Sequence, residues 1–218
     1  KYLDNAFLNS SDSKVLVELI DKYGIDDTLN KIDGMFAFCL FDREKNILIS
    51  ARDHIGIKPL YKYISDKTNS ICYSSEIKPI INYFRNEISF NKKMISEFLK
   101  YKYLSNNNTM FKGIKLVEFG NYEEIFLDDF DNSSKKKWFN FNESTIEQSF
   151  DIAISNICKE QIISKVPVAL QLSGGVDSTL IFELLKGFKN IETYSVIFQN
   201  NYEFNEENYI RKVLNNNK

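Results

Sequence analysis

The sequence has only one histidine and three cysteines among its 218 residues. Cys39, Cys72 and Cys158 lie far apart, and none belongs to a Cys-x-x-Cys pair. This argues against a zinc site, which is usually built from four His or Cys ligands at short spacings. Three cysteines in apolar surroundings also do not suggest a disulfide framework. They predict buried free thiols in a reducing compartment, the cytoplasm.

The chain also lacks a long hydrophobic run and an excess of positive charge. No apolar stretch approaches the length of about 18 residues that indicates a membrane helix, so we expect no membrane partner. The formal net charge is −2 and the pI is about 5.6, so no basic surface recruits nucleic acid. Hydrophobic residues make up 43% of the chain and include 18 Phe and 12 Tyr, enough for a sizeable core.

The strongest pattern that is present is Ser173-Gly174-Gly175-Val176-Asp177-Ser178, between an apolar segment at 166–172 and a helical pattern at 178–186. A strand, a glycine-rich turn and a helix N-terminus together form an anion site, because free amides and the helix dipole favour phosphate. An aspartate fits beside phosphates when a cation bridges them, so Asp177 is predicted to bind Mg²⁺. The alternative is an ordinary turn with a helix cap.

Elsewhere, hydrophobic periodicity predicts two domains on either side of a polar segment at 128–137. The first should be antiparallel α+β, with a helix that begins at Ser11-Asp12 and ends at Gly24. Its other expected elements are strands at 35–41, 47–50, 60–64, 71–74 and 122–127 and helices at 76–84 and 92–101. The second should be α/β with a parallel sheet, because helices at 143–164, 178–186 and 205–214 alternate with strands at 166–172 and 192–198.

Two sets of motifs resemble known families. The Ser173–Ser178 loop resembles the SGGxDS loop of PP-loop ATP pyrophosphatases, and it differs from a Walker A loop because no lysine follows the glycines. Three earlier segments are similar to signatures of class II glutamine amidotransferases: GMFAF at 34–38, RDHIGIKPLY at 52–61 and SSEIK at 74–78. In this order, the two sets resemble the glutamine-hydrolysing asparagine synthetase family.

This resemblance implies a fold class and a domain layout. We expect a partial α+β αββα sandwich of the N-terminal-nucleophile type, followed by a partial α/β PP-loop domain with a parallel sheet. The amidotransferase domain should cover 1–131, a linker 132–142 and the ATP-binding synthetase domain 143–218. Both ends are expected to be cut from a longer protein, which should form a homodimer.

For the first domain, the resemblance implies a site for glutamine. The family's nucleophile is an N-terminal Cys, and no residue of this sequence matches it, so we assign no catalytic residue here. Asp12 matches the aspartate that holds the α-amino group of glutamine; the alternative is a helix cap. Lys14 stands where the family usually has Glu. Met35 and Ile57 match positions that line the family's ammonia tunnel, with core packing as the alternative.

Three further residues of this domain are expected to be structural. Arg52 and Asp53 should form a pair that fixes the loop between the sheets. His54 should pack rather than catalyse.

For the second domain, the resemblance implies binding of ATP and Mg²⁺. Asp177 would hold the metal, and the backbone at Leu172 and Val196 would frame the adenosine. The ATP- and pyrophosphate-binding residues are then Leu172, Ser173, Gly174, Gly175, Asp177, Ser178 and Val196. The implied reaction converts aspartate to asparagine through β-aspartyl-AMP, with ammonia from glutamine.

Other functions remain open at this stage. The acceptor could be another carboxylate, such as a sugar acid or a β-lactam precursor. The glutaminase half could be a scaffold beside an ammonia-dependent ligase. The chain could also be a truncated, non-catalytic protein that binds nucleotide.

Overall fold

The computed structural model of the chain describes residues 11–141, 148–164, 166–188, 191–198 and 205–216. It divides into two compact units, Lys1–Asn142 and Glu143–Lys218. The first unit is antiparallel and the second contains a parallel strand pair.

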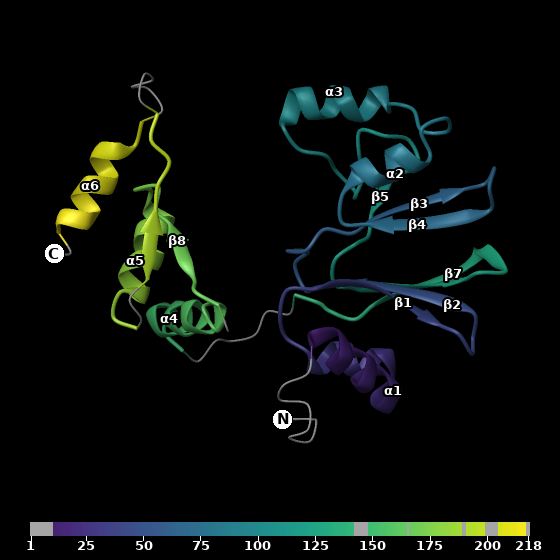
Figure 1. Ribbon diagram of the computed structural model, residues 1–218, viewed down its shortest axis with the longest axis horizontal. Coiled ribbons are helices and arrows are strands. Elements are labelled where there is room, and N and C mark those ends of the chain that lie inside the picture. The colour runs from purple at the N-terminus through teal and green to yellow at the C-terminus, as the bar shows by residue number, and fades with distance from the viewer. Residues whose placement is uncertain (1–10, 142–147, 165, 189–190, 199–204, 217–218) are drawn as a thin grey trace. The chain divides into compact units, whose positions relative to one another are not determined.

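The first unit has four layers, in the order helix, sheet, sheet, helices (Figure 1). Helix α1 (Asp12–Lys31) covers a four-stranded sheet in the order β1-β2-β6-β7. These strands are β1 (Ala37–Asp42), β2 (Ile47–Arg52), β6 (Asn121–Phe126) and β7 (Asp129–Lys137). The second sheet has the order β4-β3-β5, from β3 (Tyr61–Ser65), β4 (Ser70–Ser74) and β5 (Lys115–Leu116). Helices α2 (Ile77–Tyr83) and α3 (Lys92–Tyr101) cover its outer side, which gives the layer order of the expected partial αββα sandwich.

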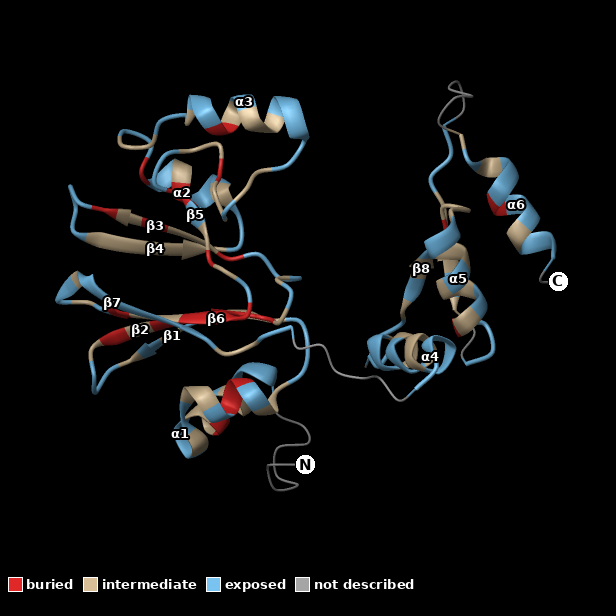
Figure 2. Cartoon of the chain, turned by 180° about the vertical axis from the view of Figure 1, so that it is seen from behind, coloured by how far each residue is buried: buried red, intermediate tan, exposed pale blue. Residues whose placement is uncertain are grey.

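Each sheet packs on its helices through alternate residues of its strands. On the first sheet, Ile47, Ile49 and Ala51 of β2 pack with Leu29 of α1 and Tyr122 of β6. This follows from the two-residue period of a strand, which sends every second side chain to the same face. Figure 2 shows the buried residues along β2 and β6 and on the inner side of α1.

The second sheet has its own core, formed by Tyr63 of β3 with Ile80 of α2, Phe84 and Ile114. The two sheets are joined by an ion pair, in which Nζ of Lys62 on β3 lies 2.5 Å from Oε2 of Glu123 on β6. Both side chains are mostly buried, so each charge has its partner where water is scarce.

Two predictions for the first unit were wrong in part. Helix α1 is broken at Gly24, with φ of 78° and ψ of 170°, but it continues to Lys31 and buries Thr28 and Leu29 beyond the break. The predicted linker at 132–142 begins inside strand β7, which pairs with β6 in antiparallel register. That strand is exposed along nearly its whole length and has no apolar alternation. Lysines are typical of such edge strands, and they gave the segment the composition of a linker.

In the second unit, strands β8 (Ala169–Gln171) and β9 (Glu192–Tyr194) pair in parallel, which confirms the predicted α/β arrangement. Helices α4 (Phe150–Gln161), α5 (Val176–Leu185) and α6 (Glu207–Asn215) alternate with them along the chain. The strands are shorter than predicted, and α5 begins two residues earlier. Part of the predicted helix at 143–164 lies outside the described residues.

All three cysteines are free, but the prediction that they would be buried was wrong. Cys39 is exposed, and Cys72 and Cys158 are half-buried. Cys39 lies on β1, an edge strand of its sheet, so it has a neighbouring strand on one flank only. None of the described helices combines the length and the hydropathy needed to cross a membrane.

Candidate functional site

Arg52, at the end of β2, is 4% exposed and holds the loop that leads to β3. Its Nε donates to the carbonyl oxygen of Lys58 at 2.7 Å, and its terminal nitrogens donate to those of Gly56 and Val117 at 2.6 Å each. The planar guanidinium suits this role because it carries five donors in a fixed geometry. Gly56 has φ of +74°, and a Cβ there would lie 2.7 Å from Nη2 of Arg52, so the loop needs glycine at this point.

Asp53, 1% exposed, accepts amides of the same loop. Its Oδ1 accepts from Ile57 at 2.9 Å and from Ile55 at 3.3 Å, and its Oδ2 accepts from Lys58 at 3.0 Å. Burial acts to raise the pKa of this carboxyl, but the backbone amides that bond the carboxylate bring the pKa below its ordinary value. Arg52 and Asp53 therefore fix the loop between the sheets, as the sequence predicted.

His54 packs between two aromatic rings. Its ring centroid lies 4.7 Å from that of Trp138 and 4.7 Å from that of Phe139, both in edge-on geometry. This confirms the prediction that His54 is a packing residue.

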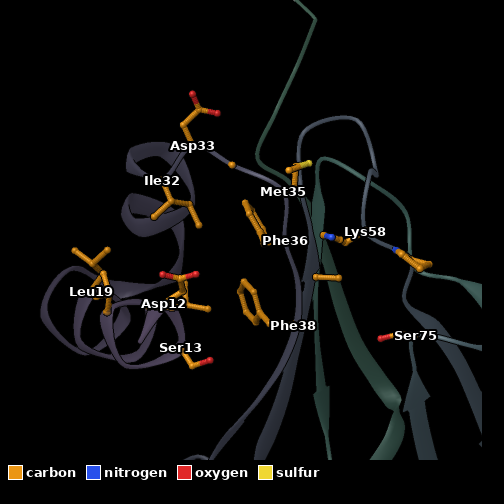
Figure 3. A pocket seen from close by; sticks show the side chains of 15 residues that line it. Asp12, Ser13, Leu19, Ile32, Asp33, Met35, Phe36, Phe38, Lys58 and Ser75 are labelled. Atoms are coloured by element: carbon orange, nitrogen blue, oxygen red, sulfur yellow. The ribbon is translucent and has the colours of Figure 1, made fainter. Parts of the chain in front are cut away.

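A cavity of about 720 Å³ lies between α1 and the chain that leads into β1 (Figure 3). Its walls come from the first turns of α1, the α1–β1 connection, the loop after β2 and the residue after β4. The lining residues are Asp12, Ser13, Val15, Leu16, Leu19, Ile32, Asp33, Gly34, Met35, Phe36, Ala37, Phe38, Lys58, Pro59 and Ser75. All three amidotransferase-like motifs therefore contribute to one cavity, although they are far apart in the sequence.

The carboxylate of Asp12 is not the cap of α1. Ser11 is the N-cap residue, and its Oγ accepts the amide of Lys14 at 3.4 Å. Asp12 is the first helical residue, is exposed and lines the cavity. Figure 3 shows it on the α1 side of the cavity, with Phe36 and Phe38 across from it. The alternative role as a helix cap thus falls to Ser11, and the Asp12 side chain is available to a ligand.

The two residues predicted to line a tunnel are differently placed. Met35 and Ile57 are each 48% exposed, so the alternative that they are core residues was wrong for both. Met35 lines the cavity, whereas Ile57 is not among its lining residues and lies in the loop held by Asp53. Met35 and Ile57 both lie next to a turn and outside the strands, which explains why their side chains are exposed.

Sequence reasoning did not single out four further lining residues, Phe36, Phe38, Lys58 and Ser75. Each lies within a motif segment, so the motifs themselves were the signal that could have found them. Two phenyl rings supply an apolar wall, Asp12 and Asp33 supply carboxylates, and Lys58 supplies an ammonium group. This combination suits a small molecule with both an ammonium and a carboxylate group.

In the second unit, the glycine-rich loop joins β8 to α5 and is closed by serine hydroxyls. The Oγ atoms of Ser173 and Ser178 lie 3.0 Å apart, and Ser178 Oγ donates to the carbonyl of Gly175 at 3.2 Å. The amide of Gly175 donates to Ser173 Oγ at 3.3 Å. Gly175 is the N-cap of α5 and no side chain caps this end. The first amides of α5 therefore lack intrahelical acceptors, which suits an anion.

Gly174 allows the loop to pack against α6. Its φ is +81°, a conformation that side chains rarely adopt. An added Cβ would lie 2.9 Å from the Ile210 nitrogen and 2.9 Å from the Tyr209 Cβ. The loop therefore needs glycine here both for its backbone conformation and for the close approach of α6.

The remaining predicted nucleotide-binding residues lie at this loop or on the neighbouring strand. Leu172 is fully buried, and its amide donates to the Tyr194 carbonyl of β9 at 2.9 Å. Val196 lies two residues beyond β9 and is 59% exposed. Asp177 is exposed in the first turn of α5, and the buried Oγ1 of Thr179 has no hydrogen-bond partner. The loop thus offers free amides and an exposed carboxylate on one turn of helix.

These groups fit phosphate together with a divalent cation. Among the described residues, no group of three or more His, Cys, Asp or Glu side chains could hold a metal by itself. Mg²⁺ does not require such a cage, because it commonly binds one carboxylate together with waters and substrate phosphates. A single Asp177 beside a phosphate site is sufficient for that mode.

Two protein families match the chain in sequence. The glutamine amidotransferase domain family matches residues 1–139, and the asparagine synthase family matches residues 149–218. The two matches follow one another in the order that the motifs predicted.

Curated relatives carry corresponding names. The chain is 25% identical to "Putative asparagine synthetase [glutamine-hydrolyzing] 2" of Methanocaldococcus jannaschii, over 94% of this chain and 41% of that protein. It is 28% identical to "Asparagine synthetase [glutamine-hydrolyzing] 1" of Bacillus subtilis, over 88% of this chain and 31% of that protein. The chain therefore spans about a third to two-fifths of these relatives. A solved B. subtilis glutamine phosphoribosylpyrophosphate amidotransferase aligns with TM-score 0.37 and 15% identity, over 88% of this chain and 40% of that one.

Proposed function

The chain belongs to the glutamine amidotransferase family, and from this premise we propose that the complete protein is an ATP-dependent carbon–nitrogen ligase supplied with ammonia by glutamine. Two observations, one in each unit, carry the proposal. Three motif segments and Asp12 line a single cavity in the first unit. The second unit, which matches the asparagine synthase family, presents a phosphate-type loop at the start of α5.

In the first unit, we assign the cavity to glutamine. Asp12 would hold the α-amino group, because a carboxylate pairs with an ammonium more strongly than a neutral acceptor does. Lys58 is held in place by the bonds that Arg52 and Asp53 make to its backbone. It would face the α-carboxylate, and the phenyl rings would contact the methylene groups.

Hydrolysis of glutamine requires a nucleophile, and none of the three cysteines lines the cavity. Cys39, Cys72 and Cys158 lie on β1, β4 and α4. The nucleophile that the family resemblance implies is an N-terminal Cys whose α-amino group serves as the base, and we assign none of these three cysteines to that role. Ammonia would leave past Met35 and Ile57, whose apolar side chains do not trap it by protonation or hydrogen bonding.

In the second unit, we assign the loop to ATP. An oxygen of the acceptor carboxylate attacks the α-phosphorus, the bond from that phosphorus to the bridging oxygen breaks, and pyrophosphate leaves. The free amides at the start of α5 would stabilise the negative charge that develops on pyrophosphate. Ammonia then attacks the acyl carbon, AMP leaves with the bonding electron pair, and the nitrogen loses a proton to give the amide.

Mg²⁺ would neutralise the phosphate charges during this displacement. Asp177 is the residue that would hold it, since its carboxylate is exposed on the first turn of α5 beside the loop.

We propose aspartate as the acceptor and asparagine as the product, on the strength of the names that the relatives carry. We also propose that the reaction takes place in the cytoplasm; the three free thiols support this, since free thiols are usual in a reducing compartment.

The test is a product assay on the complete protein with glutamine, aspartate, ATP and Mg²⁺. The proposal expects asparagine, glutamate, AMP and pyrophosphate in equal amounts. Formation of ADP instead of AMP would contradict the assignment of the loop. Glutamate formation with no amide product from aspartate would contradict the acceptor and direct the search to other carboxylates.

A further inference from the structure

The peptide group between Leu172 and Ser173 is held at both ends by hydroxyl groups. The Oγ of Ser195 donates to the Leu172 carbonyl oxygen at 2.6 Å. On the other side of the same peptide, the Ser173 amide donates to the Oγ of Ser178 at 3.3 Å. A peptide group is planar, so these two bonds together fix its orientation.

This peptide is the first of the glycine-rich loop. Regular pairing between β8 and β9 ends at Gln171 and Tyr194. One residue farther along, the Leu172 amide still donates to the Tyr194 carbonyl at 2.9 Å, but Leu172 is no longer part of a strand. The Ser195 hydroxyl therefore replaces the sheet bond that would otherwise hold the Leu172 carbonyl.

Burial makes the bond from Ser195 to the Leu172 carbonyl important. Leu172 is fully buried, so little water can reach its carbonyl oxygen to replace Ser195 as the hydrogen-bond donor. Without Ser195, the peptide could reorient, and the amides and hydroxyls that follow it would shift. The loop that begins at Ser173 takes its direction from this peptide.

We propose that Ser195 is a positioning residue for ATP: its hydroxyl orients the first peptide of the phosphate loop and couples that loop to the end of β9. Val196, the next residue, is the position assigned above to the adenosine. Ser195 thereby joins the part of the site that binds the base and sugar to the part that binds the phosphates. This inference rests on the proposed function, because it needs the loop to bind ATP.

The test uses ATP–pyrophosphate exchange by the complete protein with three substitutions of Ser195. Ser195→Ala removes the donor and should raise the KM for ATP by about three- to tenfold, the usual effect of one hydrogen bond. Ser195→Thr keeps the hydroxyl on a residue that suits a strand end, so its KM should stay within about twofold of the unaltered protein. Ser195→Cys keeps the size with a weaker donor and should lie between them.

The matched control is Thr193→Val, which removes a hydroxyl from the same strand at a residue that pairs with Leu170 rather than with the loop. It should leave the KM for ATP unchanged, and glutamine hydrolysis should be unchanged in all four variants.

Two results would overturn this inference and leave the proposed function standing. One is an unchanged KM for ATP in folded Ser195→Ala, and the other is an equal rise in the KM for ATP in Ser195→Ala and Ser195→Thr. An equal rise would mean that side-chain shape, not the hydroxyl, is what matters. The absence of exchange in the unaltered protein would instead overturn the proposed function, and this inference with it.

Discussion

Arg52 and Asp53, adjacent in the chain, hold the backbone of Lys58 from both sides. Arg52 Nε donates to the Lys58 carbonyl at 2.7 Å, and Asp53 Oδ2 accepts the Lys58 amide at 3.0 Å. Both side chains are almost fully buried. The position of Lys58 at the cavity is thus set by two charged groups that take no part in the proposed chemistry.

We expect Arg52→Ala to lower the free energy of unfolding by about 3 kcal/mol, because it leaves three carbonyl oxygens without their donor and the Asp53 charge without its neighbour. Urea unfolding measures this change. Arg43→Ala, in the exposed turn after β1, is the control and should change stability by less than about 0.5 kcal/mol. Similar stabilities for the two variants would show that the loop does not depend on Arg52.

Asp53→Asn tests the pH dependence of stability. The pKa of Asp53 is lowered in the folded protein, so its carboxylate contributes stability above the unfolded pKa, about 3.9, and loses it as the pH falls through the folded value. We expect the variant to be about 2 kcal/mol less stable at pH 7 and the difference to shrink below about pH 4. Unfolding midpoints measured from pH 7 to pH 3 give the profile.

Asp66→Asn, in the exposed turn between β3 and β4, makes the same change at an exposed side chain and is the control; it should alter stability at pH 7 by less than about 0.5 kcal/mol. A difference for Asp53→Asn that stays constant across the range would contradict a charge-based role.

Asp12→Asn should weaken glutamine binding. Loss of a charged hydrogen bond to the α-amino group is expected to raise the KM for glutamine by roughly 10- to 100-fold. The activity driven by free ammonia should be unchanged, because the second unit is untouched. The control is Asp21→Asn, an exposed residue of the same helix that does not line the cavity. Equal KM values for the two variants would remove Asp12 from the glutamine site.

Gly174→Ala should disrupt the phosphate loop. The substitution combines a positive φ with a Cβ 2.9 Å from two atoms of α6, and we expect a cost of about 2 to 3 kcal/mol and loss of ATP–pyrophosphate exchange. Gly187→Ala is the matched control, because no atom lies within 4 Å of its added Cβ. Exchange at the normal rate in Gly174→Ala would show that the loop tolerates a displaced α6.

Asp177→Ala should abolish ATP–pyrophosphate exchange at any Mg²⁺ concentration, because the proposed protein ligand of the metal is removed. Asp151→Ala makes the same change in the first turn of α4 and should leave exchange intact. Exchange retained in Asp177→Ala would mean that another group binds the metal.

Much of the site could be predicted because it depends on local properties of the chain. Gly174 marks the loop, because glycine readily adopts the positive φ that the loop needs there. Ser11 marks the start of α1, because its hydroxyl accepts the backbone amide three residues later. The role of Arg52 and Asp53 in fixing the loop was also predictable, because their bonds to Gly56 and Lys58 stay within one short motif. The packing of His54 depends instead on Trp138 and Phe139, which are remote in the sequence.

Other features had no local signal. Strand β7 is polar on both faces, and only its pairing with β6 makes it a strand. Cys39 looked buried from its apolar neighbours, but it lies on a sheet edge. The bond from Ser195 to Leu172 joins residues that are 23 positions apart, and neither segment has a sequence pattern that predicts it.

The sequence by itself thus determined the order of the two domains, the glycine-rich loop and the motifs, since these rest on backbone freedom, capping and periodicity within a few residues. The tertiary structure decided which motifs share a cavity, that β7 is a strand and that the Ser195 hydroxyl bonds to the Leu172 carbonyl. Those features arise when sheets and helices pack, because packing sets the distances between residues that are remote in the chain.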